Sequence, residues 1–421
     1  MNATSINIFA TLCFALALLH TFLVKQFQHW ALRFPEGSVG ENFFHLLGEV
    51  EVVFGLWATI FLIVIASSSG SSTSLQYLEG LNFTEPAFVF VIMAVCSTRP
   101  ILQVATQWIT LVSKVLPFKG QIPFYFSCLV LGPLLGSFIT EPAAMTVTAL
   151  ILLEHFYKRG MSQKFMYATL GLLFVNVSVG GTLTPFAAPP ILMVAAKWKW
   201  DLSYTFLHFG WRAILTTLLT TTLITFRFKD ELSKMKPLKI NNNELSIPAW
   251  VKFLHLVFLG GIILVSHHMV IFVGLFLLFL GLVTVTKEYQ SELKLRESLL
   301  VGFFLGGLVI LGAPQRWWLE PLITQLNHLF LYIGCIGLTA ITDNAALTYL
   351  GSQVPHLSEV SKQALVAGSV VGGGLTVIAN APNPAGYGIL NASLGEEGIS
   401  SLQLFLNALI PTLIASLCFW P

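Results

Sequence analysis

The chain has 421 residues, of which 55% are hydrophobic and only 10% are charged, and its mean hydropathy is +0.78. Soluble domains carry about 25% charged residues, so this composition excludes a soluble protein and predicts an all-α, polytopic membrane protein. The net charge of +2, without basic clusters among aromatic residues, gives no reason to expect a nucleic-acid partner. The five cysteines form no close pair, so neither a disulfide framework nor a zinc site is expected.

Apolar runs predict the membrane elements in chain order. The first repeat, 1–228, is expected to contain three spans, a re-entrant hairpin, a broken helix and a last span, at 7–24, 47–66, 86–98, 121–156, 165–196 and 206–226. A polar cytoplasmic linker is predicted at 229–249. The second repeat, 250–421, follows the same plan at 250–266, 269–286, 298–313, 327–352, 363–392 and 401–420. The first run lacks a basic n-region and is interpreted as a span, not a cleaved signal.

The distribution of positive charge favours the two hairpins. If 121–156 and 327–352 each enter and leave on one side, most of the 22 Lys and Arg residues fall on the same face of the membrane. Each half then crosses the membrane an odd number of times, so the second half is inverted relative to the first. The sequence thus predicts two inverted repeats, each with a re-entrant hairpin and a broken transmembrane helix, the logic of secondary transporters.

Two acidic phrases stand at matching places in the halves. I-T-E-P-A-A-M-T (139–146) and I-T-D-N-A-A-L-T (341–348) are identical at five of eight positions, with Glu141 in one and Asp343 in the other. A charged acid at mid-membrane depth costs several kcal/mol, so such an acid is expected to bind a cation or to hold a proton. An acid that does both couples sodium to protons by competition.

Two glycine-rich phrases follow the acids in the same order. G-G-T-L-T-P-F-A-A-P-P (180–190) and G-G-G-L-T-V-I-A-N-A-P (372–382) interrupt apolar helices. Backbone groups freed in a membrane need protein or a water-filled cavity to satisfy them, so these segments are expected to line a binding site. The alternatives are that Gly and Pro only kink these helices, and that the acids lie at the membrane surface.

Oxygen ligands for a hard cation are expected close to both acids. Besides Glu141 and Asp343 themselves, the candidate ion-binding residues are Thr140, Asn176, Thr184, Thr342, Asn344, Thr376, Asn380 and Asn383. The acidic and glycine-rich phrases of each repeat together form one copy of the site. The second copy carries Asn344 and Asn380 where the first has Pro142 and Ala188, so Asp343 ranks ahead of Glu141 as the exchange site. No cofactor is expected, because sodium and protons would be the transported species.

The phrase T-D-N-A-A, followed by a Gly-rich broken helix with asparagines, resembles the sodium/proton antiporter and arsenite-permease branch of the ion-transporter superfamily. Over most of its length the chain is similar to a bacterial family of sodium/proton antiporters. That resemblance implies a multi-pass protein of the bacterial inner membrane, working as a homodimer in the lipid bilayer on a small cation. Dicarboxylate carriers of the superfamily have Ser-Asn-Thr at the hairpin tips; acids here point away from a carboxylate substrate.

Exchange of sodium or lithium for protons is therefore the predicted function. A cation- or proton-coupled permease for arsenite or an organic anion is the alternative, although neither acidic phrase contains a basic residue. An enzyme is not expected, because no H-E-x-x-H or G-x-S-x-G motif occurs and no histidine lies near either phrase.

Overall fold

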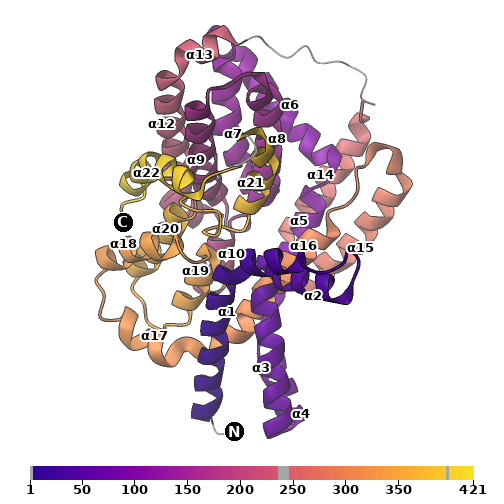
Figure 1. Ribbon diagram of the computed structural model, residues 1–421, viewed down its shortest axis with the longest axis vertical. Helices are drawn as coiled ribbons and strands as arrows, with labels where there is room; N and C mark the ends of the chain where they lie inside the picture. Colours follow the sequence, from indigo (N-terminus) through magenta and orange to yellow (C-terminus); the bar gives the residue numbers. More distant parts are fainter. Residues whose placement is uncertain (1–2, 236–245, 395–397) are drawn as a thin grey trace. The chain divides into compact units, whose positions relative to one another are not determined.

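The computed structural model describes residues 3–235, 246–394 and 398–421, and this part of the chain contains helices but no strand (Figure 1). The prediction of an all-helical membrane protein is confirmed. Most of the predicted 229–249 linker, residues 236–245, lies outside the described residues. The chain forms two compact units, each made of segments distant in sequence, and each is described separately below.

The first unit comprises Met1–Phe90, Leu295–Gln325 and Tyr349–His356. Its helices are α1 (Ala3–Ala31), α2 (Val39–Leu47), α3 (Val53–Ser69), α4 (Ser71–Glu79), the start of α5 (Thr84–Cys96), α16 (Leu295–Gly312) and α17 (Arg316–Ile323). Helices α3 and α16 approach closely at small residues, because a Cβ on Gly307 would meet the backbone of Phe54 and Gly55. Glycine at this crossing therefore allows the two apolar helices to pack backbone to backbone.

The second unit comprises Val91–Lys294, Leu326–Thr348 and Leu357–Pro421. In the order of the chain, its α-helices are α6 (Arg99–Val115), α7 (Ile122–Ile139), α8 (Glu141–His155), α9 (Gln163–Gly180), α10 (Pro189–Trp198), α11 (Leu202–Thr205), α12 (Trp211–Arg227), α13 (Lys229–Lys234), α14 (Ala249–Leu264), α15 (Met269–Val285), α18 (His328–Thr339), α19 (Asn344–Ser352, which ends in the first unit), α20 (Glu359–Gly372), α21 (Asn383–Asn391) and α22 (Ser401–Cys418).

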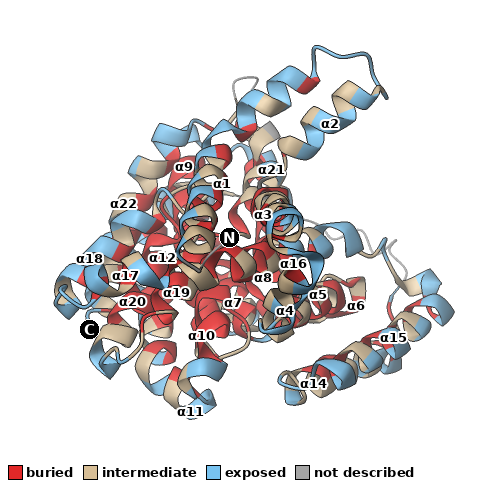
Figure 2. Cartoon of the chain, turned by 90° about the horizontal axis from the view of Figure 1, so that it is seen from below, coloured by how far each residue is buried: buried red, intermediate tan, exposed pale blue. Residues whose placement is uncertain are grey.

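Helix α9 forms the centre of the second unit. Every residue from Phe165 to Gly180 is buried, the class drawn in red in Figure 2, and most of these side chains are apolar. It ends at Gly180. A 3-10 turn, η3 (Gly181–Leu183), then interrupts the α-helical hydrogen bonding before α10 begins at Pro189. Helix α20 likewise ends at Gly372, and α21 begins only at Asn383. Both predicted broken helices are therefore interrupted at their Gly-Gly pairs.

Six helical segments of the described chain are long and apolar enough to cross a membrane. They are Thr4–Ala31, Ile122–Ile139, Gln163–Leu183, Leu202–Arg227, Leu295–Ile323 and Ser401–Cys418. The pair α4 and α5 would add a seventh span if it is counted as one segment bent by 66°. The protein is thus an integral, multi-pass membrane protein.

Helices α7 and α8 pack along one another on either side of Thr140. A Cβ on Gly136 would lie 3.1 Å from the Cβ of Ala144, and one on Gly132 would lie within 2.3 Å of the Thr148 hydroxyl. Small residues on α7 therefore let α8 approach closely, as small-residue stripes do in membrane helix pairs. This pairing brings the end of α7 and the start of α8 together at Thr140 and Glu141.

Candidate functional site

Glu141 is the first residue of α8, and its side chain is completely buried. Asn380 donates a hydrogen bond from Nδ2 to Glu141 Oε2 over 2.8 Å. The other carboxyl oxygen, Oε1, is buried without a hydrogen-bond partner in the protein. Gly181 lies against it, since a Cβ at that position would fall 2.5 Å from Oε1. A buried carboxyl group with one oxygen free is suited to hold a proton or to bind a cation.

Further buried polar atoms around Glu141 also lack a protein partner. They are Thr140 Oγ1, Asn344 Oδ1 and Nδ2, Asn380 Oδ1 and Asn383 Oδ1. These residues belong to one connected region. Asn380 donates to Glu141, and the backbone N–H groups of Asn344 and Asn383 donate to the carbonyl oxygens of Ala379 and Asn380 over 3.1 and 3.0 Å. Buried polar groups are nearly always hydrogen-bonded, so such a group of unpaired oxygens indicates a place where a bound species completes the contacts.

The chemistry of these atoms suits a hard cation. Among the described residues, no group of three or more His, Cys, Asp or Glu side chains is placed to hold a metal ion. The oxygens available are one carboxylate, amide carbonyls and a hydroxyl, which are ligands for hard cations and not for zinc or copper. The composition of the site therefore suits a hard cation.

Asp343 has a different environment from Glu141. It is only half-buried, and it stands immediately before α19. Its Oδ1 accepts a hydrogen bond from the backbone N–H of Ala346 over 3.0 Å, the contact of a helix N-cap. The carboxyl groups of Asp343 and Glu141 are close enough to interact electrostatically. Asp343 thus has a structural task of its own at the edge of the site.

Both unwound segments are tied to the helix before the acidic phrase by a threonine. Thr184 Oγ1 donates to the carbonyl oxygen of Ser137 over 2.6 Å, and Thr376 Oγ1 donates to that of Ala340 over 2.8 Å. The two hydroxyls are therefore occupied by backbone, and both threonines position their segments.

Ser137 adds a second tie in the first copy only. Its hydroxyl donates to the carbonyl oxygen of Gly180 over 2.7 Å and accepts from the N–H of Leu183 over 2.8 Å. Thr339, near the same level of α18, is buried with its hydroxyl unpaired. Ser137 therefore ties the first unwound segment to α7, whereas no such contact is made by Thr339.

Asn176 lies apart from the acids, in a polar network among α7, α9 and α12. Its Nδ2 donates to the carbonyl oxygen of Leu129 over 2.9 Å and to Thr221 Oγ1 over 3.0 Å. Its Oδ1 accepts from Thr220 Oγ1 over 2.8 Å. The amide is thus fully engaged in joining three helices.

Two other predicted ligands bond to backbone. Thr342 Oγ1 donates to the carbonyl oxygen of Leu338. Asn383 Nδ2 donates to the carbonyl oxygens of Gly373 and Thr376, both over 2.8 Å, which leaves only its Oδ1 free. The structure therefore brings together Thr140, Glu141, Asn344, Asn380 and Asn383 as residues with free oxygens.

Sequence reasoning missed Ser137 and Gly181 as residues of the site. Ser137 lies in the last turn of α7, and its contacts with Gly180 and Leu183 depend on how the unwound segment packs against that helix. Nothing in the sequence distinguished Gly181 from Gly180, because the close approach to the carboxyl group follows from how the segment folds back on α8.

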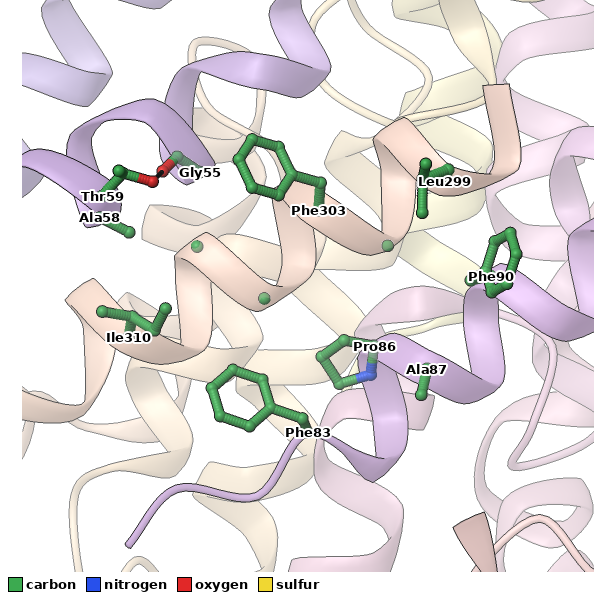
Figure 3. Close-up of a pocket in the computed structure, with 13 residues that line it drawn as sticks. Gly55, Ala58, Thr59, Phe83, Pro86, Ala87, Phe90, Leu299, Phe303 and Ile310 are labelled. Atoms are coloured by element: carbon green, nitrogen blue, oxygen red, sulfur yellow. Dashed lines mark hydrogen bonds between the residues drawn. The ribbon is translucent and has the colours of Figure 1, made fainter. Parts of the chain in front are cut away.

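An apolar cavity of about 350 Å³ lies in the first unit, between α3, α5 and α16. Figure 3 shows Phe83, Phe303 and Ile310 around it. Its lining is apolar except for Thr59, whose hydroxyl donates to the carbonyl oxygen of Gly55 over 2.8 Å. The cavity offers no free oxygen for a cation and is unrelated in chemistry to the site at Glu141.

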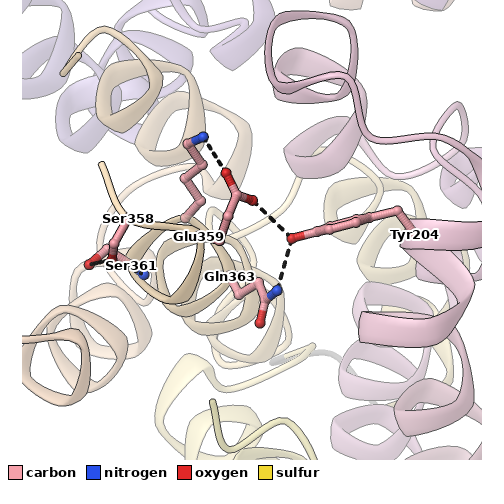
Figure 4. A network of polar contacts seen from close by, with 6 residues as sticks. Tyr204, Ser358, Glu359, Ser361 and Gln363 are labelled. Atoms are coloured by element: carbon pink, nitrogen blue, oxygen red, sulfur yellow. Dashed lines mark hydrogen bonds and ion pairs between the residues drawn. The ribbon is translucent and has the colours of Figure 1, made fainter. Parts of the chain in front are cut away.

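A surface network connects the start of α20 with α11. Tyr204 donates from its hydroxyl to Glu359 Oε2 over 3.2 Å and accepts from Gln363 Nε2 over 2.8 Å (Figure 4). Lys362 donates to Glu359 Oε1 over 2.6 Å, and this hydrogen bond holds the pKa of the Glu359 carboxyl group below its ordinary value. The contacts fix the first turn of the helix that leads to Gly373.

The chain matches a known protein family over nearly its whole length. Residues 5–421 match the model of a protein family described as "Putative Na+/H+ antiporter". A search of curated proteins finds no match. The match covers nearly the whole chain, including both acidic phrases and both unwound segments.

Proposed function

Because the chain belongs to this sodium/proton antiporter family, we propose that it exchanges sodium or lithium for protons and that Glu141 is the group for which they compete. The observation that carries the proposal is the free, buried Oε1 of Glu141 among other unpaired oxygens. A family of cation/proton transporters needs a membrane-embedded group that accepts either species, and this carboxyl group has that character.

The exchange follows from the need to neutralise a buried charge. An ionised carboxylate without a partner is costly inside a protein, so Glu141 is stable either protonated or paired with a cation. Asn380 holds Oε2 by a hydrogen bond in both states, so a proton and a cation can alternate at Oε1.

The inverted-repeat architecture is part of the proposal. It is supported by the matching roles of Thr184 and Thr376, each of which ties a segment after a Gly-Gly pair to the helix before an acidic phrase. Re-entrant hairpins at 121–156 and 327–352 would bring both phrases to the middle of the membrane. We further propose a homodimer in a bacterial inner membrane, with both termini outside, as the distribution of Lys and Arg favours.

Purified protein in vesicles with an internal pH dye tests the function. Addition of sodium outside is expected to change the internal pH, and Glu141→Gln is expected to abolish the change because the amide cannot take up the proton. Glu154→Gln is the matched control, since Glu154 lies on the same helix but is exposed and paired with Lys158. Wild-type protein that moves no protons on addition of sodium or lithium at any pH from six to nine would refute the proposal.

A further inference from the structure

Helices α8 and α19 begin within the two acidic phrases. Their first residues do not align with each other when the phrases are matched by identity. Helix α8 begins at Glu141 and α19 begins at Asn344. The residues just before them, Thr140 and Asp343, both occupy the N-cap position, and their carbonyl oxygens accept the first helical hydrogen bond over 3.0 and 3.2 Å. In position along the helix, Glu141 therefore corresponds to Asn344, and Asp343 corresponds to Thr140.

Contacts made by the second glycine of each pair agree with this correspondence. Gly181 lies against Glu141, where an added Cβ would be 2.5 Å from Oε1. Gly373 lies against Asn344, where an added Cβ would be 2.8 Å from Nδ2. In each copy, the second glycine leaves room for the first side chain of the helix to reach the unwound segment.

The threonine ties show the same shift of one residue. Thr184 donates to the carbonyl of Ser137, four residues before Glu141, and Thr376 donates to that of Ala340, four residues before Asn344. Helix starts, glycine contacts and threonine ties are separate observations, and all three match Glu141 with Asn344.

We infer that Asn344 is the cation ligand of the second copy, so that the cation is bound by the Glu141 carboxylate and the Asn344 amide oxygen while Asp343 caps α19. The inference rests on the proposed function and names the ligand opposite Glu141. Asn344 is fully buried, and neither polar atom of its side chain has a protein partner. Asp343 is half-buried, and its Oδ1 already accepts the N–H of Ala346.

As a cation ligand, Asn344 contributes to cation affinity but takes up no proton. An amide oxygen is a good ligand for sodium and remains neutral throughout the cycle. Loss of this ligand is expected to weaken sodium binding by about tenfold or more, the range for a lost contact to a charged group.

Sodium-dependent thermal stabilisation of the purified protein in detergent tests this directly, because a ligand of the folded state raises the melting temperature. Asn344→Leu keeps the size of the side chain but removes its oxygen, and we expect the half-maximal sodium concentration to rise by about tenfold or more. Asn344→Asp restores an oxygen and should recover sodium-dependent stabilisation. Asp343→Asn keeps a good N-cap and should change the half-maximal concentration by at most about threefold.

The inference is overturned if Asn344→Leu binds sodium like the wild type, or if Asp343→Asn loses sodium binding while Asn344→Leu keeps it. Transport in vesicles gives a second measurement: Asn344→Leu should raise the KM for sodium more than it lowers kcat, whereas a purely structural defect would lower the amount of folded protein at unchanged KM. Wild-type protein that is neither stabilised by sodium nor active in exchange would instead refute the proposed function, and the inference with it.

Discussion

The copy around Glu141 and the copy around Asp343 share a plan but differ in how their polar groups are used. In the first copy the acid is fully buried, one of its oxygens is held by Asn380, and Ser137 ties the unwound segment. In the second copy Asp343 is half-buried and caps α19. The side chain that lies against the second glycine of the unwound segment is the Asn344 amide. A duplicated sequence phrase therefore does not imply a duplicated chemical role.

This difference follows from the positions at which the helices begin. In the first copy the residue before the helix is Thr140 and the acid is already inside it; in the second copy the acid itself precedes the helix. A shift of one residue rotates a helical side chain by about 100°. The two acids therefore point to different surroundings although their neighbours in sequence are alike.

The largest expected effect comes from Gly181. In Gly181→Ala the new methyl group would overlap Glu141 Oε1 and displace the carboxyl group. We expect the exchange rate in vesicles to fall by about 100-fold, because a displacement of about 1 Å in a site is enough for such a loss. Gly373→Ala is the counterpart in the second copy, where the methyl group would meet the Ser178 hydroxyl and Asn344 Nδ2. It should cost less, since it displaces a neutral amide and not the carboxyl group for which sodium and protons are proposed to compete. Equal losses in the two variants would contradict the asymmetry.

Asn380 comes next in expected effect. Asn380→Ala removes the hydrogen bond to Glu141 Oε2, and the ionised carboxylate loses about 1.5–3 kcal/mol of stabilisation. Sodium affinity, measured by the KM for exchange, should fall by about 10- to 100-fold. Asn407→Ala is the control, because Asn407 bonds only to a carbonyl of its own helix. An unchanged KM in Asn380→Ala would show that Asn380 does not support the cation-bound state.

A pair of substitutions tests the contacts of Ser137 in the first copy. Ser137→Ala leaves the Gly180 carbonyl and the Leu183 N–H without their partner and should lower the free energy of unfolding by about 1–3 kcal/mol. Thr339→Val replaces an unpaired buried hydroxyl by a methyl group, so the free energy of unfolding should stay the same or rise. Melting temperatures in detergent give both values, and equal destabilisation by the two substitutions would contradict the comparison.

The smallest effect is expected at the surface network that begins α20. The hydrogen bond from Lys362 lowers the pKa of Glu359, so this carboxylate stabilises the folded protein at and above its ordinary pKa of about 4.3. The stabilisation should be lost as the pH falls through the lowered folded-state value. Exposed ion pairs contribute at most about 1 kcal/mol, so the melting temperature of the wild type should exceed that of Glu359→Gln slightly at pH 7. The two proteins should melt alike at the lowest pH, and a difference that grows on acidification would be inconsistent with this assignment.

Much of the fold could be predicted from the sequence, because long apolar runs and their Gly-Pro interruptions have local causes. The breaks after Gly180 and Gly372 are examples, since both lie where the pattern predicts them. The partners of Asn176 could not be predicted, because they come from α7 and α12 and depend on how three helices pack.

The correspondence of the two acids is the instructive case. Alignment of the identical residues pairs Glu141 with Asp343, whereas the N-cap positions pair Glu141 with Asn344. Thr and Asp are both preferred N-cap residues, and Thr140 and Asp343 both stand directly before a helix. The preference of Thr and Asp for the N-cap position indicates where each helix begins, and the similarity of the two phrases does not.

Thr140 itself has a consequence for how the protein could be stabilised. Its backbone has φ +71° and ψ 152°, a conformation almost restricted to glycine, which costs a β-branched residue on the order of 1–3 kcal/mol. The residue also carries a buried hydroxyl without a protein partner next to Glu141. Engineering for thermal stability would therefore select glycine at this position and remove a buried oxygen beside Glu141. If the proposed exchange site is correct, a gain in stability at this residue is a loss for ion binding.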